Sequence, residues 1–335
     1  MCRVRHMPNA AVCLACSVLA LGGAVPHAAA QNRSDVTGYP AKPVRFVVGF
    51  PPGGGNDTIA RMVGQKLSER IGQAIVIDNR PGAGGIVAGE LTAHAPADGY
   101  TMLMMSSSLT IQRLLKHDLP YDPIGAFAGV ARLAAYRSVL VTHPSVAATS
   151  VRELVALAKA KPGALNFASS GYAVGSHLAG ELFRLAAAVD ITHVPYKGTS
   201  PASNDLLSGR IQLMFAPIVP LLQHVQSGRL RALGVTSLTR SRILPELPTI
   251  SEAGVPGYEF VGWYGVVVPA RTPREIIDRL NAGIMQVMQA PGIGARLDAE
   301  DMEFTAAAPA AFNAVRAAEV AKWAKILKQM PLRVE

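Results

Sequence analysis

The sequence is poor in cysteine. Its 335 residues contain three, Cys2, Cys13 and Cys16, all at the amino-terminal end. The rest of the chain therefore has no disulfide, no cysteine nucleophile and no cysteine-ligated metal site. Cys13 and Cys16 have the C-x-x-C spacing of redox proteins, but they lie inside an apolar run. We do not interpret them as a redox motif.

Long apolar runs are missing after the first thirty residues. No later run reaches the ~18 apolar residues that a membrane-spanning helix needs. At the start, Arg3 and Arg5 precede an apolar run, and Ala28 and Ala30 give an A-x-A cleavage pattern. We predict that residues 1–30 are a secretory signal, cleaved near Ala30, and that the mature protein is periplasmic. A lipidated Cys16 is disfavoured, because Cys13 occupies the position where such signals have leucine.

Aromatic residues are scarce, at 6%, while 50% of the residues are hydrophobic. This composition is typical of a packed globular protein, and the length suffices for two domains. The formal net charge is +9, yet there is no basic run and no aromatic interleaving. We therefore expect no nucleic-acid partner. The positive charge either attracts anionic small molecules or only aids solubility.

The pattern after residue 40 alternates between strands and helices. Val44–Phe50, Ala74–Asp78 and Tyr100–Met105 read as buried strands, with helical spacing between them. This order predicts a parallel sheet with right-handed crossovers. After one or two strands that end near Ser145, a second α/β cycle follows. A strand over 260–269, a helix that starts at Pro273 and further helices complete the chain.

The stretch "GFPPGGGNDTIAR" is the clearest candidate for chemistry. Gly53, Gly54 and Gly55 follow a strand and open a helix, where exposed backbone amides favour an anion. The alternative is a tight turn that only needs positive φ. No Lys-Ser/Thr follows, which excludes a Walker loop. Thr58 stands where a dinucleotide fingerprint has its third glycine. We therefore favour a site for a small anion.

At this point the sequence resembles a known family, the Bug extracytoplasmic solute receptors of tripartite tricarboxylate transporters. The resemblance rests on a series of motifs that run in order from about residue 40 to 290. They are "KPVRFVVGFPPGGGNDTIAR", "VIDNRPGAGG", "PADGYTMLM", "LPYDP", "NFASSG", "SHLAGELF", "HVPYKG", "GRLRALGVTS", "LPTISEAGVPGYE" and Trp263 with Gly265.

The resemblance implies a two-lobed periplasmic binding protein of the type II-like α/β class, in which each lobe is a mostly parallel sheet flanked by helices. Two crossing strands would join lobe one, 40–138 plus 262–335, to lobe two, 139–261. A small carboxylate-bearing ligand would lie in the cleft, and membrane transporter subunits would receive it. We expect a monomer with no catalysis, no cofactor and no metal.

The resemblance places part of the ligand site on lobe one. Asp57 either caps the helix or contacts a donor on the ligand. The serines after the third strand either donate to a carboxylate or cap the next helix. Asn79 either lies in the cleft or sets the turn before Pro81. The predicted lobe-one residues are Phe50, Gly53, Gly54, Gly55, Asn56, Asp57, Asn79, Gly84, Ser106 and Ser107.

A second glycine- and serine-rich loop would form the matching half on lobe two, unless its polar residues only cap a helix. His177 is expected to be packed or to line the cleft, and Tyr196 to close over the ligand. Ala216 stands where many relatives have an acid, which favours a plain acid over an amino acid. The predicted lobe-two residues are Ser169, Ser170, Gly171, Gly175, Ser176, His177, Tyr196 and Ala216.

Two other functions stay open at this stage. A receptor that presents its ligand to a sensor protein would need the same cleft, so the sequence does not separate it from a transport receptor. A hydrolase is disfavoured, because there is no G-x-S-x-G elbow, no H-E-x-x-H motif and no outstanding pair of acids.

Overall fold

Two β-sheets organise the computed structural model, which describes residues 38–115 and 118–329. The first sheet has six strands in the order β11-β4-β10-β3-β1-β2, and the second has five in the order β7-β6-β8-β5-β9. The predicted signal peptide and its cleavage near Ala30 lie outside the described residues. No helix within the described ranges is long and apolar enough to cross a membrane.

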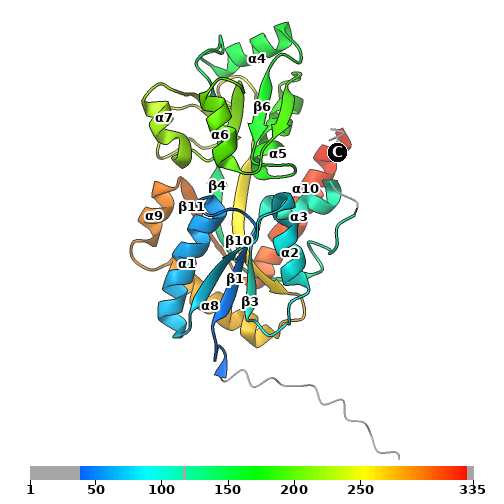
Figure 1. The fold of residues 1–335 in the computed structure, drawn as a ribbon, viewed down its shortest axis with the longest axis vertical. Helices are drawn as coiled ribbons and strands as arrows, with labels where there is room; N and C mark the ends of the chain where they lie inside the picture. Colours follow the sequence, from blue (N-terminus) through cyan, green and yellow to red (C-terminus); the bar gives the residue numbers. More distant parts are fainter. Residues whose placement is uncertain (1–37, 116–117, 330–335) are drawn as a thin grey trace, which may run out of the picture. The chain divides into compact units, whose positions relative to one another are not determined.

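The first sheet combines strands from both ends of the chain (Figure 1). β2, β1 and β3 pair in parallel, as the alternating pattern predicted. β10 lies antiparallel between β3 and β4, so β4 points the same way as β1. The strands are β1 Val44–Val48, β2 Ile75–Asn79, β3 Thr101–Ser106, β4 Phe127–Arg137, β10 Val261–Pro269 and β11 Met302–Ala307.

Helices cover both faces of this sheet (Figure 1). α1 and α8 pack against each other on one face, and α3 and α10 contact each other on the other. The strands between them are nearly continuous apolar runs, as expected for a sheet buried on both faces. The helices are α1 Gly55–Ile71, η2 Ala83–Gly85, α2 Ile86–Ala93, α3 Ser107–Leu115, α8 Arg274–Met288, α9 Ile293–Ala299 and α10 Pro309–Gln329.

The second sheet comes from one continuous part of the chain. β7, β6 and β8 pair in parallel, and β5 is antiparallel to both β8 and β9. Its strands are β5 Val139–Thr142, β6 Asn166–Ser169, β7 Thr192–Pro195, β8 Leu213–Ala216 and β9 Arg231–Val235. Its helices are α4 Val151–Ala160, α5 Gly175–Ala186, α6 Thr199–Leu207, η3 Val219–Leu221 and α7 Leu222–Gln226.

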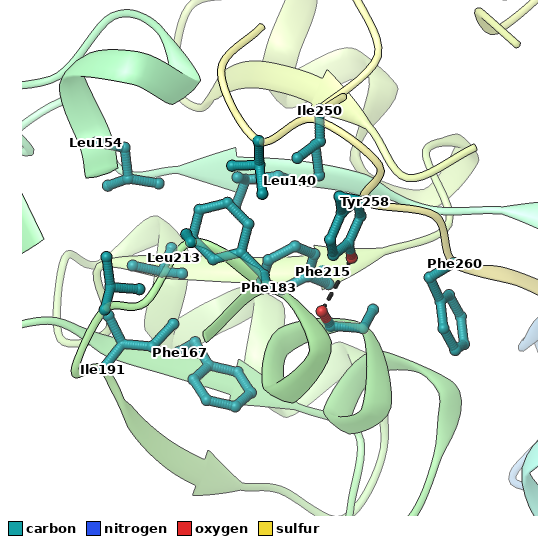
Figure 2. Close-up of a cluster of buried hydrophobic side chains, with 14 of the residues drawn as sticks. Leu140, Leu154, Phe167, Phe183, Ile191, Leu213, Phe215, Ile250, Tyr258 and Phe260 are labelled. Carbon is teal, nitrogen blue, oxygen red and sulfur yellow. Dashed lines mark hydrogen bonds between the residues drawn. The ribbon is translucent and has the colours of Figure 1, made fainter. Parts of the chain in front are cut away.

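The core beside the second sheet is aromatic, although the chain has few aromatic residues. Phe167, Phe183 and Phe215 are fully buried here, and Tyr258 donates its hydroxyl to the Ala179 carbonyl at 2.9 Å (Figure 2). Burial of a large apolar side chain contributes roughly 1.5–3 kcal/mol. These side chains hold β6, β8 and α5 together, and therefore fix the loop between β6 and α5.

Two details near the carboxyl end differ from the sequence-based expectation. β11 interrupts what the sequence suggested were only helices, because its pairing with β4 supplies order that its local sequence lacks. Pro273 is the residue before α8, not its first helical residue. The first difference bears on the predicted site, because Cε of Met302, the first residue of β11, lies 3.5 Å from where a Cβ on Gly55 would be.

Candidate functional site

The three glycines after β1 have different structural roles. Gly53 has φ +85°, a left-handed conformation that a side chain would strain. Gly54 has φ −86° and precedes the helix. Gly55 is the first residue of α1, and a Cβ there would lie 2.5 Å from the Tyr264 hydroxyl. The need for positive φ in a tight turn therefore explains Gly53, whereas the missing side chain of Gly55 lets the Tyr264 hydroxyl lie close to the start of α1.

Asp57 holds this loop in place. Its carboxylate accepts the Gly53 amide at 3.0 Å, Arg61 Nε at 2.8 Å and Asn79 Nδ2 at 2.9 Å. Burial alone would raise the pKa of Asp57, but the hydrogen bonds from Arg61, Gly53 and Asn79 hold that pKa below its usual range. Asp57 therefore stays ionised and ties the glycine loop to β2.

The expectation that Asp57 caps α1 is wrong, because no side chain of the described residues caps this helix. Asp57 accepts the amide of Gly53, which lies before the helix. Helix geometry leaves the first amides of α1 without intrahelical acceptors. The adjacent Asn56 Oδ1 is buried with no hydrogen-bond partner among the described residues. This helix end therefore offers several donors and one acceptor to a ligand or water.

Asn79 and Phe50 support the same loop. Asn79 Nδ2 also donates to the Phe50 carbonyl at 3.0 Å, and its Oδ1 accepts Arg61 at 3.1 Å. Asn79 therefore does more than set the turn before Pro81. Its side-chain hydrogen bonds are all directed to the Asp57 network and the end of β1.

The serines after β3 lie at the start of α3 and are buried. Ser106 and Ser108 share a hydrogen bond of 3.0 Å between their hydroxyls. The Ser107 side chain is hydrogen-bonded to Tyr136, a residue of β4. All three hydroxyls thus have partners inside the protein.

The second glycine loop, between β6 and α5, is built from neutral groups. Ser176 Oγ accepts the Ser170 amide at 3.0 Å and pairs with the Ser170 hydroxyl at 3.1 Å. Gly171 has φ +147°, and Gly175 is the first residue of α5. Here too no described side chain caps the helix. The alternative that the polar residues only cap α5 is therefore wrong, and the first amides of α5 are available.

Two stacked histidines hold this second loop. The rings of His177 and His193 lie 3.9 Å apart between centroids. His177 Nδ1 accepts the Ala173 amide at 3.0 Å, and His193 Nε2 lies 2.6 Å from Ser169 Oγ. Burial, together with the charges of His193 and Arg184, lowers the pKa of His177 to about 3, and burial lowers that of His193 to about 4. Both rings are neutral and structural.

The contact between Ser169 and His193 has the composition of a nucleophile–base pair. The hydroxyl of Ser169 donates to the Gly171 carbonyl at 2.7 Å, so the His193 ring donates to Ser169 instead of accepting its proton. Ser169 is also fully buried. This arrangement does not activate a nucleophile. Within the described ranges, no cluster of metal-ligating side chains is present either.

Two tyrosines that the sequence interpretation missed bring the two loops together. Tyr136 of β4 and Tyr264 of β10 stack with ring centroids 4.6 Å apart. A Cβ on Gly55 would lie 2.5 Å from the Tyr264 hydroxyl, and one on Gly175 would lie 2.5 Å from the Tyr136 hydroxyl. The available signal was a polar-tipped aromatic residue on each predicted crossing strand.

Gly84 is a second point where the two halves of the predicted site approach each other. It has φ +66°, and a Cβ there would lie 3.1 Å from the Tyr172 carbonyl of the second loop. Gln112 of α3 donates to the Gly84 carbonyl at 2.9 Å. Gly84 is therefore placed against residue 172, as a cleft-lining position would be.

Two predicted site residues are engaged elsewhere. The Tyr196 hydroxyl donates to Asp205 at 2.8 Å. Burial and this bond raise the pKa of Tyr196 to about 12. Ala216 is buried at the end of β8. The structure therefore gives Tyr196 a contact with α6 and shows no group on Ala216 that could bind a ligand through a hydrogen bond.

A cavity of about 580 Å³ lies away from all of these residues, beside β9. Arg231 and Glu246 are charged residues at its wall, and none of the predicted site residues lines it. Its other walls are mostly apolar: Pro144, Leu230, Ile243, Leu244 and Leu247. The site at the two glycine loops differs from this cavity in two ways: it has the free backbone amides of α1 and α5 as donors, and the starts of these two helices lie beside one tyrosine pair.

Comparison with known proteins agrees with this geometry. The family model described as "Tripartite tricarboxylate transporter family receptor" matches residues 59–332. A protein from the tcbD-tcbE intergenic region of a Pseudomonas species is 40% identical over 295 residues, which cover 88% of each chain.

Solved structures share the fold. The structure of an R. palustris protein with adipate is 36% identical, with a TM-score of 0.83, and the match covers 87% of this chain and 98% of that one. The structure of the periplasmic binding protein BugD is 31% identical, with a TM-score of 0.81, and the match covers 87% of this chain and 98% of that one. The predicted two-lobed binding-protein fold and the resemblance to the Bug proteins are confirmed. The chain belongs to the family of tripartite tricarboxylate transporter receptors.

Proposed function

We propose that this protein is a periplasmic receptor that captures a small dicarboxylic acid and delivers it to the membrane subunits of a tripartite tricarboxylate-type transporter. One observation carries the proposal. Two helices, α1 and α5, start with a glycine and without a side-chain cap, and their first residues contact one stacked tyrosine pair. A dicarboxylate fits two such anion-binding helix ends.

The proposed site includes the residues predicted from the sequence, with different roles. The amides of Gly54, Gly55 and Asn56 at α1, and those of Gly175 and Ser176 at α5, would hold the carboxylates. Asp57 and Asn79 would shape the first loop, and Ser169, Ser170 and His177 the second. We keep the other residues predicted from the sequence as part of the proposed site without assigning them a role: Phe50, Gly53, Gly84, Ser106, Ser107, Gly171, Tyr196 and Ala216.

We keep the predicted lobe boundaries as part of the proposal: 40–138 plus 262–335, and 139–261. They are supported by the strand order, because the chain passes from β4 to β5 at Ser138 and enters β10 at Val261. Closure of the two lobes around the ligand would commit it for delivery. The proposal also includes a signal cut near Ala30 and a monomeric mature protein.

The proposed ligand is a plain or hydroxylated acid, not an amino acid. An ammonium group needs acceptors, and the Asp57 carboxylate of the first loop is already engaged by three donors. Ala216 brings no acid either. The buried Asn56 Oδ1 could accept a ligand hydroxyl. Tighter binding of aspartate or glutamate than of succinate, malate and adipate would contradict this ligand class.

We propose that the protein is not an enzyme. The support is the state of the two histidines, both neutral and hydrogen-bonded within the second loop. Neither has the orienting carboxylate that a general base requires. Glu181 lies 3.9 Å from His177 Nε2 but is bonded to Arg184 at 2.9 Å.

The test uses the purified protein without its signal. Each acid of a panel of succinate, malate, glutarate and adipate is added during a thermal melt, and its concentration is followed by NMR. A receptor melts at a higher temperature as the acid concentration rises and leaves the acid intact. Conversion of any acid, or no shift with any of them, would contradict the proposed function. Native mass spectrometry of the protein as purified would reveal a retained ligand.

A further inference from the structure

Tyr136 and Tyr264 form an unusual pair at the centre of the proposed site. They come from neighbouring antiparallel strands, where Tyr136 pairs with Gly262 and Tyr264 pairs with Ala134. This register places both side chains on the same face of the sheet. Their rings stack at 4.6 Å with an interplanar angle of 19°, and both are buried. The stack fixes the direction of both hydroxyls.

Each hydroxyl reaches the first residue of a different helix. The space that a side chain would occupy on Gly55 is filled by the Tyr264 hydroxyl, at 2.5 Å from the Cβ position. The same holds for Gly175 and the Tyr136 hydroxyl. A side chain at either position would have to displace a rigid, buried ring. Each glycine therefore lets a phenol oxygen lie beside a set of free helix amides.

The two hydroxyls differ in their partners. The hydroxyl of Tyr136 is hydrogen-bonded to Ser107, and burial nevertheless raises the pKa of Tyr136 to about 12. Burial raises the pKa of Tyr264 well above its usual range, with the charges of Tyr136 and Glu300 adding to it and no hydrogen bond opposing it. The Tyr264 hydroxyl therefore stays protonated and can donate a hydrogen bond. Ser107 is bonded to Tyr136 and not to Tyr264.

We propose that the Tyr264 hydroxyl donates a hydrogen bond to the ligand carboxylate bound at the start of α1, and that Tyr136 positions it through the ring stack. This inference rests on the proposed function, because it names a further contact of the same site. The hydroxyl and the first amides of α1 are all donors, so they converge on one acceptor, and a carboxylate is the acceptor that such a group fits.

The buried Asn56 Oδ1 is an independent sign that a ligand or water belongs here. Asn56 follows Gly55 and is 8% exposed, and its Oδ1 has no partner among the described residues. Buried polar atoms in native proteins normally have a partner. A ligand at the start of α1 would bring that partner and would also accept from Tyr264.

The experiment compares three Tyr→Phe variants, each of which removes one oxygen atom and keeps the ring. Tyr264→Phe removes the proposed donor and Tyr136→Phe removes the hydroxyl bonded to Ser107. Tyr121→Phe is the matched control, because the buried Tyr121 hydroxyl has no hydrogen-bond partner among the described residues and contacts Gly89 inside α2. Binding of the acid of the panel that binds the wild type most tightly is measured by calorimetry, with a thermal melt for each variant.

We expect Tyr264→Phe to weaken binding about tenfold or more, because a hydrogen bond to a charged group is lost. Tyr136→Phe should weaken it less than threefold, and Tyr121→Phe should leave it unchanged. Equal affinity of Tyr264→Phe and the wild type would overturn the inference and leave the proposed function intact. Failure of the wild type to bind any acid of the panel would overturn both.

A double-mutant cycle with Gly55→Ala separates a ligand contact from a structural role. The alanine methyl group would displace the Tyr264 hydroxyl, so Gly55→Ala alone should weaken binding by a similar factor. In the Tyr264→Phe background the same change should cost less than threefold more, because the displaced oxygen is already gone. Full additivity of the two effects in affinity would contradict the proposed contact.

Discussion

The two glycine loops each precede a helix without a side-chain cap, and they are held in place by different chemistry. The loop before α1 is held by an ion, the Asp57 carboxylate, which collects Gly53, Arg61 and Asn79. The loop before α5 is held by neutral groups, the hydroxyls of Ser169 and Ser176 and two imidazoles. Both leave the first helix amides uncapped.

In the proposed site, the amides of the two helix ends are thus held in place by two different sets of side chains. A free carboxylate beside the first loop would repel an anionic ligand. The carboxylate of Asp57 instead accepts hydrogen bonds from Gly53, Arg61 and Asn79, and the charge of Arg61 offsets its own. The neutral second loop has no such repulsion. Protonation of His177 and His193 at low pH would destabilise it. The two loops should therefore fail under different changes.

The largest effect is expected for Asp57→Ala. The variant removes a buried acceptor and leaves the Gly53 amide, Arg61 and Asn79 without it, which should lower the free energy of unfolding by about 3 kcal/mol. Urea unfolding measures this. Asp78→Ala is the control, since Asp78 also pairs with two arginines, Arg45 and Arg80, but is more exposed. A loss as small as the control's, under about 1 kcal/mol, would contradict the role of Asp57.

The second effect concerns pH and the second loop alone. The folded pKa values of His177, about 3, and His193, about 4, lie below the ordinary value of 6.5. Their contribution to stability is present above pH 6.5, falls as the pH drops below 6.5, and is lost through the folded pKa values. Between pH 7 and pH 5.5 each should lose about 1 kcal/mol.

The measurement is urea unfolding at several pH values in this range. His193→Phe keeps an aromatic ring in the stack and should show about half of the pH dependence. Burial raises the pKa of the neighbouring Glu181, which opposes the effect at lower pH, so the comparison stays above pH 5.5. A wild type whose stability does not change with pH would show that the two rings are not held neutral.

A third change removes one hydroxyl from the second loop. Ser169→Ala leaves the His193 Nε2 proton and the Gly171 carbonyl without their partner, and should lower the free energy of unfolding by about 1.5 kcal/mol. Ser227→Ala is the control, because Ser227 bonds only carbonyls of α7 in an exposed position. Equal effects of the two substitutions would show that Ser169 does not hold the loop.

The smallest effects should separate two adjacent glycines. Gly53→Ala forces a side chain into positive φ and should destabilise by about 1 kcal/mol. Gly54→Ala meets nothing closer than the Pro51 carbonyl at 3.9 Å and should change stability by less than about 0.5 kcal/mol. Thermal melts of the two variants would reveal a reversed order, which would contradict the assigned roles.

The fold could be predicted from the sequence because its main elements are local. Apolar strands followed by glycine turns and helices placed β1, α1, β2 and β3 within a few residues. β11 could not be predicted, since its order depends on pairing with β4, more than 160 positions away. That pairing is a property of the whole sheet, and no local pattern encodes it.

The sequence predicted the two glycine loops of the proposed site, but not the tyrosine pair that lies beside them. Glycine and serine next to helix starts are visible in a sequence, and both loops precede helices that have no side-chain cap. The stack of Tyr136 on Tyr264 depends on the register of β4 against β10, which a sequence does not give. The partners of Asp57 and Tyr196 were likewise decided by side-chain packing.

The strand order also determines when the protein can fold. β10 lies between β3 and β4, so the first sheet stays split, with two open edges, until residues 261–269 have left the ribosome. The strands of the second sheet, 139–235, need no later strand and can assemble sooner. During synthesis the second sheet can therefore be complete while the first sheet still waits for its central strand.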